Sequence, residues 1–215
     1  MNAVPGTGSD YNKVAGQKTQ RTEALADGVF AIAMTLLVLD LRMPIGEAIR
    51  TEGDLWVQLS SIGPKLISYF LSFMTLGIFW TGHSAQYTYI ARSDRHLNWL
   101  SIFFLMFVSI LPFTTAFLSE NINFRLAIGL YWLNIFFLGL IIFLHWGYAY
   151  RNEFISGDLS ARQAIDRAIR RRIIVAQLLY FVAALLCFIN NYLSIGATIA
   201  IQLNYAIAPS FRRKS

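Results

Sequence analysis

The chain has 215 residues, of which 56% are hydrophobic and only 14% are charged, and its formal net charge is +6. Soluble domains of this length rarely carry so few charges, so the composition excludes an ordinary soluble protein. The apolar stretches are continuous rather than alternating, which excludes a β-barrel that faces lipid outside and water inside. The sequence therefore predicts an all-α integral membrane protein.

Six stretches approach or exceed the length that crosses ~30 Å of hydrocarbon at ~1.5 Å per helical residue. They cover residues 20–41, 66–90, 97–118, 126–150, 173–189 and 192–208. We expect residues 19–211 to form one bundle of six transmembrane helices, between a flexible cytoplasmic tail at 1–18 and a basic cytoplasmic tail at 212–215. The short connections predict antiparallel neighbours.

The basic residues follow this topology. If the N-terminus lies inside, only Arg42, Arg50, Lys65 and Arg125 of the 18 basic residues lie outside. The positive-inside rule then places both termini in the cytoplasm and makes a nucleic-acid partner unnecessary. Residues 151–172 are expected to form a short amphipathic cytoplasmic helix whose basic face meets lipid headgroups. The external segment 42–65 is expected to be an irregular loop or a short surface helix.

The first span keeps Glu23 and Asp27 in its first half, an arrangement that lipid does not tolerate. Its uninterrupted apolar part, residues 29–39, is well short of the ~20 residues that a lone lipid-facing helix needs. We therefore expect this helix to be buried among other helices or to line a polar path.

One side of the first span carries a stripe. Ile32, Thr35, Leu36 and Leu39 are separated by three, four and seven residues, so they share one sector of a helix at roughly 100° per residue. Around a symmetry axis such a stripe gives stacked rings that form a dewetting gate. The alternative is that the apolar residues are ordinary packing and Thr35 bonds back to its own helix. The spacing alone leaves both open.

The same arithmetic places Asp27 opposite the stripe, toward the subunit interior. Polar residues on the second and third spans lie at a matching membrane depth, so we expect a hydrogen-bonded belt that joins helices one to three. For its loop members, simple solvation is the alternative. The predicted network consists of Arg21, Asp27, Trp80, His83, Asp94 and Asn98.

Other function classes find less support. No histidine-rich metal cluster, serine-nucleophile constellation or phosphate-cradling glycine loop is present, so we expect no enzyme, no cofactor and no small-molecule substrate. A proton-coupled transporter that uses Asp27 and His83 as relay groups remains an alternative, although internal repeats are missing. A non-conducting membrane scaffold is a third hypothesis.

Two segments resemble the transmembrane protein 175 family of potassium channels, which occurs in animal endolysosomes and in prokaryotes. The first is Arg21 with Asp27-Gly-Val-Phe-Ala-Ile-Ala-Met-Thr-Leu-Leu-Val-Leu-Asp, and the second is Trp80-x-x-His83, Asp94, Asn98 and Leu111-Pro-Phe-Thr-Thr-Ala-Phe-Leu118. The chain departs from the family pattern at Leu25-Ala26, where Phe-Ser is usual, so the hydrogen bond of that serine is lost.

The resemblance implies a homotetramer in a prokaryotic plasma membrane, with the first helices around a potassium-permeable pore. It implies that Ile32 is the narrowest ring, that Leu36 and Leu39 extend it, and that Thr35 supplies a hydroxyl layer where potassium binds transiently. The residues themselves agree on one point, because no Thr-Val-Gly-Tyr-Gly segment offers a filter of backbone carbonyls. We therefore expect a passive cation channel with weak potassium selectivity.

Overall fold

The computed structural model describes residues 19–42 and 49–207, and these fold into helices joined by short connections. The tails predicted at 1–18 and 212–215 lie outside the described residues. The helices are α2 (Thr19–Leu36), η1 (Leu37–Asp40), α3 (Glu52–Ser61), α4 (Gly63–Tyr87), α5 (Arg95–Glu120), α6 (Arg125–Arg151), α7 (Leu159–Leu185), η2 (Leu186–Phe188) and α8 (Asn191–Ile207).

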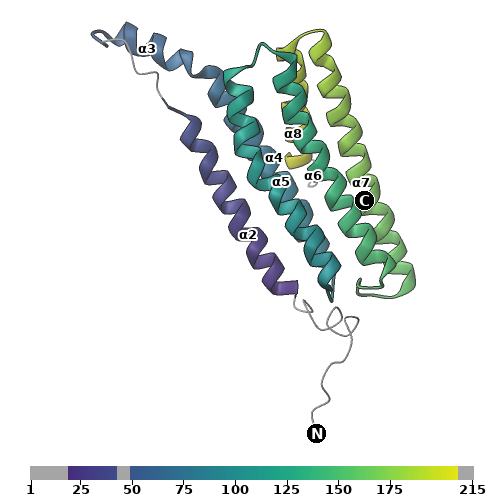
Figure 1. The fold of residues 1–215 in the computed structure, drawn as a ribbon. Helices are drawn as coiled ribbons and strands as arrows, with labels where there is room; N and C mark the ends of the chain where they lie inside the picture. The colour runs from purple at the N-terminus through teal and green to yellow at the C-terminus, as the bar shows by residue number, and fades with distance from the viewer. Residues whose placement is uncertain (1–18, 43–48, 208–215) are drawn as a thin grey trace.

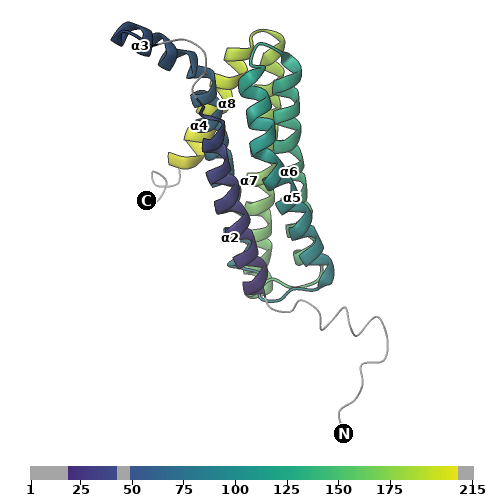
Figure 2. The same ribbon diagram turned by 60° about the vertical axis from the view of Figure 1, so that its left-hand side comes forward.

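Long helices that follow one another in the chain run antiparallel in one bundle (Figures 1 and 2). Contacts link α4 to α5, α5 to α6, α6 to α7, α7 to α8 and α8 back to α4, so five helices close a ring. Helix α2 packs on the outside of this ring, against α4 and α5. We call the end where α2 starts and α4 finishes the basic end of the bundle.

The all-α membrane fold is confirmed, and the count of spans is confirmed in part. Four helical stretches are long and apolar enough to cross a membrane: Thr19–Asp40, Arg95–Glu120, Arg125–Arg151 and Leu159–Phe188. Helices α3 and α4 pass together as a fifth, although they are bent by 44° relative to each other. Helix α8 has only 17 residues and stops partway along the bundle (Figures 1 and 2).

One sequence prediction is wrong. Residues 151–172 do not form a separate cytoplasmic helix, because α7 runs without a break from Leu159 to Leu185 and includes Arg170, Arg171 and Arg172. No glycine or proline interrupts this stretch, so nothing stops the helix where its composition changes from basic to apolar. The Asp158 side chain caps its start by accepting a hydrogen bond from the Ala161 N–H at 2.8 Å.

The segment 42–65, predicted to be external, contains the short helix that was one of the two expected outcomes. Helix α3 begins with a capping box, in which the Thr51 hydroxyl accepts from the Asp54 N–H and Asp54 accepts from the Thr51 N–H. Figure 1 shows α3 projecting away from the bundle, and it has no buried residue. Its apolar side chains, Trp56 among them, are therefore left for the membrane interface or for another chain.

The core of the ring contains a ladder of hydroxyl and amide groups. The Thr115 hydroxyl donates to Ser72 at 2.7 Å, and the Tyr131 hydroxyl lies within hydrogen-bond distance of both Ser72 and Thr75. The Gln202 amide donates to the Thr75 hydroxyl at 2.7 Å. These five buried side chains come from α4, α5, α6 and α8. In lipid such hydrogen bonds fix which helix faces meet, because apolar packing alone discriminates weakly.

Helices α6 and α7 approach closely at Gly139. The Gln177 amide donates to the Ile135 carbonyl at 3.3 Å, and a Cβ atom at position 139 would overlap this amide group. Glycine at position 139 therefore leaves room for the Gln177 side chain, which a larger residue would displace.

We predict that Gly139→Ala lowers the free energy of unfolding by about 1 kcal/mol, because the new methyl group displaces Gln177 from its hydrogen bond. In a Gln177→Ala background the same substitution should cost nothing. Thermal unfolding in detergent measures both, with Gly129→Ala as the control, since a Cβ there meets nothing within 4 Å. Equal effects of Gly139→Ala in the two backgrounds would contradict the proposed contact.

Candidate functional site

The first helix is attached to the bundle by one face only. Four of the 18 residues of α2 are buried, and they recur at the three- and four-residue spacing of a helix. Phe30 is the largest of these side chains, and it lies beside Phe104 of α5 and His83 of α4. Val29 and Met34 are half-buried beside them, and most of the remaining surface of α2 is not covered by the described residues. The four buried residues are Thr22, Ala26, Phe30 and Ala33.

The predicted stripe lies on this uncovered surface. Ile32 is 61% exposed, Leu36 is 43% exposed and Leu39 is 56% exposed, and Thr35 between them is exposed as well. Packing inside the subunit therefore does not account for these side chains. Beyond Leu36 the helix tightens into the 3-10 turn η1, which ends at Asp40.

The hydroxyl group of Thr35 has a defined orientation. It donates to the Ile32 carbonyl one turn earlier at 2.8 Å. This bond of Thr35 to its own helix is the one expected if the stripe is ordinary packing. Because the hydroxyl proton is used inside the helix, the oxygen presents its lone pairs outward. The group can therefore act as an acceptor, which is the role that a cation requires.

Asp27 does not point into the subunit interior, and this part of the prediction is wrong. The residue is exposed, and its carboxylate accepts a hydrogen bond from the Trp80 indole at 2.8 Å. The periodicity placed Asp27 correctly away from the stripe, but the side opposite the stripe is only partly covered by α4. The contact joins α2 to α4 at the edge of the bundle.

Two further contacts lie near the basic end. Asn98 of α5 accepts hydrogen bonds from the Thr22 hydroxyl at 3.0 Å and from the Ser93 hydroxyl at 2.9 Å, so it joins α2, α5 and the preceding loop. Asp94 caps α5 by accepting from the Leu97 N–H, and it also accepts from the Tyr148 hydroxyl of α6 at 2.6 Å. Two residues of the predicted belt, Asn98 and Asp94, are thus bonded to neighbouring elements. Their partners are Thr22, Ser93 and Tyr148, which the sequence analysis did not single out.

His83 occupies a different environment from the other predicted belt residues. It is buried, and its ring stacks on Phe104 with centroids 5.2 Å apart. Within the part of the chain that the structure describes, its Nε2 atom has no hydrogen-bond partner. It therefore lies beside the belt without a described hydrogen bond to Asp27. Arg21 is exposed in the first turn of α2.

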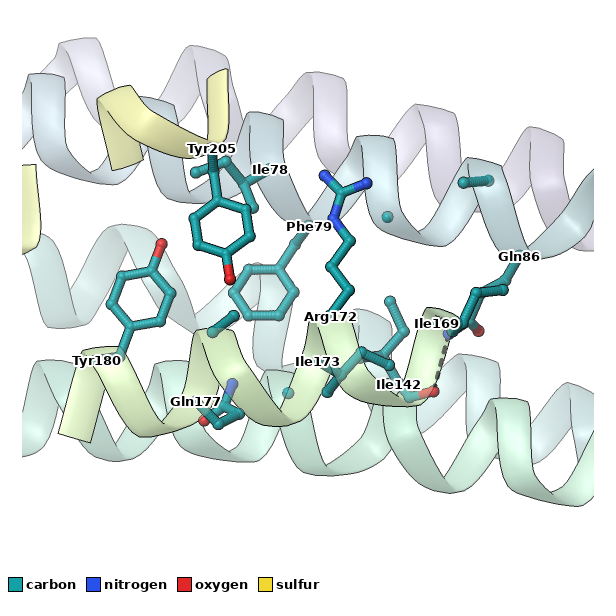
Figure 3. Close-up of a pocket in the computed structure, with 14 residues that line it drawn as sticks. Ile78, Phe79, Gln86, Ile142, Ile169, Arg172, Ile173, Gln177, Tyr180 and Tyr205 are labelled. Carbon is teal, nitrogen blue, oxygen red and sulfur yellow. Dashed lines mark hydrogen bonds between the residues drawn. The ribbon is translucent and has the colours of Figure 1, made fainter. Parts of the chain in front are cut away.

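A second histidine, His145, lies next to His83 with ring centroids 6.0 Å apart. His145 is buried and shares a hydrogen bond of 3.0 Å with the Gln86 side chain. Gln86 in turn donates to the Ile142 carbonyl, as the dashed line in Figure 3 shows. Predicting the contact between Gln86 and His145 requires the rotation of α4 and α6 about their own axes, which the sequence does not give.

The outer end of α2 is also held by a polar contact. The Ser119 hydroxyl of α5 donates to the Asp40 carboxylate at 2.8 Å. Helix α2 therefore has polar attachments near both ends, with apolar packing between them and the stripe left free along its length.

Comparisons with known proteins agree with this architecture. A family model described as "Endosomal/lysosomal potassium channel TMEM175" matches residues 21–112. A potassium channel of Chamaesiphon minutus is 32% identical over 193 residues, which cover 88% of this chain and 94% of that protein. A potassium channel of Streptomyces collinus is 42% identical over 103 residues, or 48% of each chain. The crystal structure of a lysosomal potassium-selective channel TMEM175 homolog from Chamaesiphon minutus superposes with a TM-score of 0.75 at 28% identity, covering 88% of this chain and 97% of that one.

We predict that Trp80→Phe lowers the free energy of unfolding by about 1 kcal/mol, because the Asp27 carboxylate loses its indole donor. In an Asp27→Ala background the substitution should have almost no effect, since the acceptor is already gone. Thermal unfolding in detergent, followed by circular dichroism, measures both. The matched control is Trp99→Phe on α5, whose indole makes no hydrogen bond among the described contacts. A cost that persists without Asp27 would show that Trp80 acts through packing instead.

Proposed function

The chain belongs to the TMEM175 family, and from this premise we propose that it is a passive potassium-permeable cation channel whose pore is lined by α2. The family consists of ion channels, so the expectation that the chain is not an enzyme is confirmed. In the proposed assembly four copies surround one axis, and each contributes the stripe of Ile32, Thr35, Leu36 and Leu39. Potassium is the permeant ion, and the channel needs no cofactor and no small-molecule substrate.

One observation carries this proposal: a helix long enough to cross the membrane has an apolar stripe with one hydroxyl that the described part of the chain leaves uncovered. A single copy encloses no path along this stripe, so a pore requires the stripes of several copies. Closed cyclic symmetry is the usual arrangement for identical chains. The polar contacts at Asp27, Asn98 and Asp40 support the proposal, because they hold the opposite side of α2 against α4 and α5.

The proposed pore works without a carbonyl filter. Rings of Ile32, Leu36 and Leu39 form an apolar constriction, and such a constriction opposes ion passage by excluding water. The outward lone pairs of Thr35 offset part of the lost hydration as an ion passes. Potassium sheds its water at lower cost than sodium, so a short apolar ring with one hydroxyl layer favours potassium modestly.

The proposed orientation places both termini and the basic end of the bundle in the cytoplasm, because the connections at that end carry most of the basic residues. The proposed location is the plasma membrane of a prokaryote, with the lipid bilayer and further copies of the same chain as partners.

We predict that the purified chain in liposomes passes potassium down its gradient, and that Ile32→Asn or Leu36→Asn increases the conductance about tenfold. A polar side chain wets the constriction, and a tenfold gain corresponds to about 1.4 kcal/mol off the barrier to passage. Single-channel recording measures the effect.

The control for these substitutions is Val182→Asn, because Val182 is 56% exposed and lies on α7, away from α2. It should leave the conductance unchanged. Absence of potassium flux from correctly folded oligomers would contradict the channel itself. Unchanged currents in both stripe variants would remove α2 from the pore lining.

We also predict that Thr35→Ala reduces the preference for potassium over sodium severalfold, while Thr35→Ser retains it. Alanine removes the outward oxygen, whereas serine keeps a hydroxyl that bonds to the same carbonyl. The reversal potential under bi-ionic potassium and sodium conditions measures the preference. Equal reversal potentials for wild type and Thr35→Ala would show that selectivity arises elsewhere.

A further inference from the structure

A groove of about 810 Å³ runs along the outer side of α4, between α2 on one side and Arg172 of α7 with the last turn of α8 on the other. It lies on the side of α2 that carries Asp27, away from the stripe. Among the described residues, α8 ends at Ile207 and does not extend along the part of α4 nearer the basic end.

The lining of this groove changes character along its length. Toward the middle of the bundle it is apolar, with Met34, Phe73 and Met74. Toward the basic end it becomes polar, with Asp27, Trp80, Thr81, Arg172 and Tyr205. The groove therefore has the polarity of a lipid that lies along α4 with its headgroup toward the basic end.

Arg172 is the cation at the polar end. Figure 3 shows its side chain extending from α7 toward α4, beside Tyr205 of α8. Its guanidinium lies over the Tyr205 ring, 5.9 Å from the centroid, and no carboxylate among the described residues pairs with it. The neighbouring Arg170 differs, because it bonds to Asp166. The donors of Arg172 thus face the groove without an anionic partner.

The chain itself offers few anions for this position. The described helices α4, α6 and α8 contain no aspartate or glutamate, and α5 has only Glu120 at its opposite end. The phosphate of a phospholipid is an anion that the bilayer supplies at headgroup depth, and Arg172 lies where α7 changes from basic to apolar residues.

We propose that the groove binds a phospholipid of the cytoplasmic leaflet, with the phosphate on Arg172 and an acyl chain against Phe73 and Met74 of α4. The proposal rests on the proposed orientation of the basic end, but not on ion conduction. Asp27 does not oppose it, because that carboxylate lies on the α2 wall and is engaged by the Trp80 indole.

The test is native mass spectrometry of the purified chain in detergent, titrated with phosphatidylglycerol. Arg172→Ala should weaken binding of the tightest lipid about fivefold, the loss expected for one headgroup-facing basic residue. Arg172→Lys keeps the charge and should retain most of the binding. The matched control is Arg171→Ala, which removes the same charge one position away.

Gly77→Leu should also abolish binding, because it fills the groove without changing any charge, and a Cβ at Gly77 meets nothing within 4 Å.

Three outcomes would overturn the proposal. Equal binding by Arg172→Ala and Arg171→Ala would show that Arg172 does not hold the lipid. Binding of inorganic phosphate with the same dependence on Arg172 would identify a site for free anions instead. Efficient crosslinking between copies at Tyr205→Cys, in a Cys187→Ser background, would show that another copy covers the groove. Because none of these readouts uses ionic current, they can fail while the channel function stands.

Discussion

The structure depends on how α2 is attached to the rest of the chain. Lipid tails are as apolar as leucine, so burying apolar side chains between helices gains little that lipid contact would not also provide. Hydrogen bonds between helices therefore decide which face of α2 meets the ring. The contacts of Asp27 with Trp80, of Thr22 with Asn98 and of Asp40 with Ser119 lie near the two ends of the helix and set its rotation. The exposure of the stripe follows from that rotation.

The ring that carries α2 is built to be specific in the same way. The hydroxyl and amide ladder from Thr115 to Gln202 crosses the middle of the bundle, where an unpaired polar group has no water to bind. Such groups find their partners in one arrangement of the helices and lose them in most others. A rigid ring matters for the proposed function, because a small rotation of α4 or α5 would turn α2 and change the width of an apolar constriction.

The sequence predicted helix positions well because hydropathy and charge report directly on membrane depth. Depth also explains why Asp27 and Trp80, 53 residues apart in sequence, were expected together and form a hydrogen bond. Rotation about each helix axis is not encoded so simply. The sequence therefore misplaced Asp27 in the interior and missed the pairing of His145 with Gln86. The unbroken α7 shows a different limit, since a change of composition does not end a helix that lacks a breaking residue.

The groove beside the end of α8 is lined by a residue that attaches α2 to the bundle, Asp27. Among the described residues α8 ends at Ile207, and Arg172 of α7 lines the groove beside α4. The same groove is bordered by Asp27, one of the residues that orient α2. An occupant that stabilises the α4 wall through Trp80 and Thr81 would also stabilise the hydrogen bond from Trp80 to Asp27. By thermodynamic linkage, any change in α2 that breaks this bond would then weaken binding in the groove by the same factor.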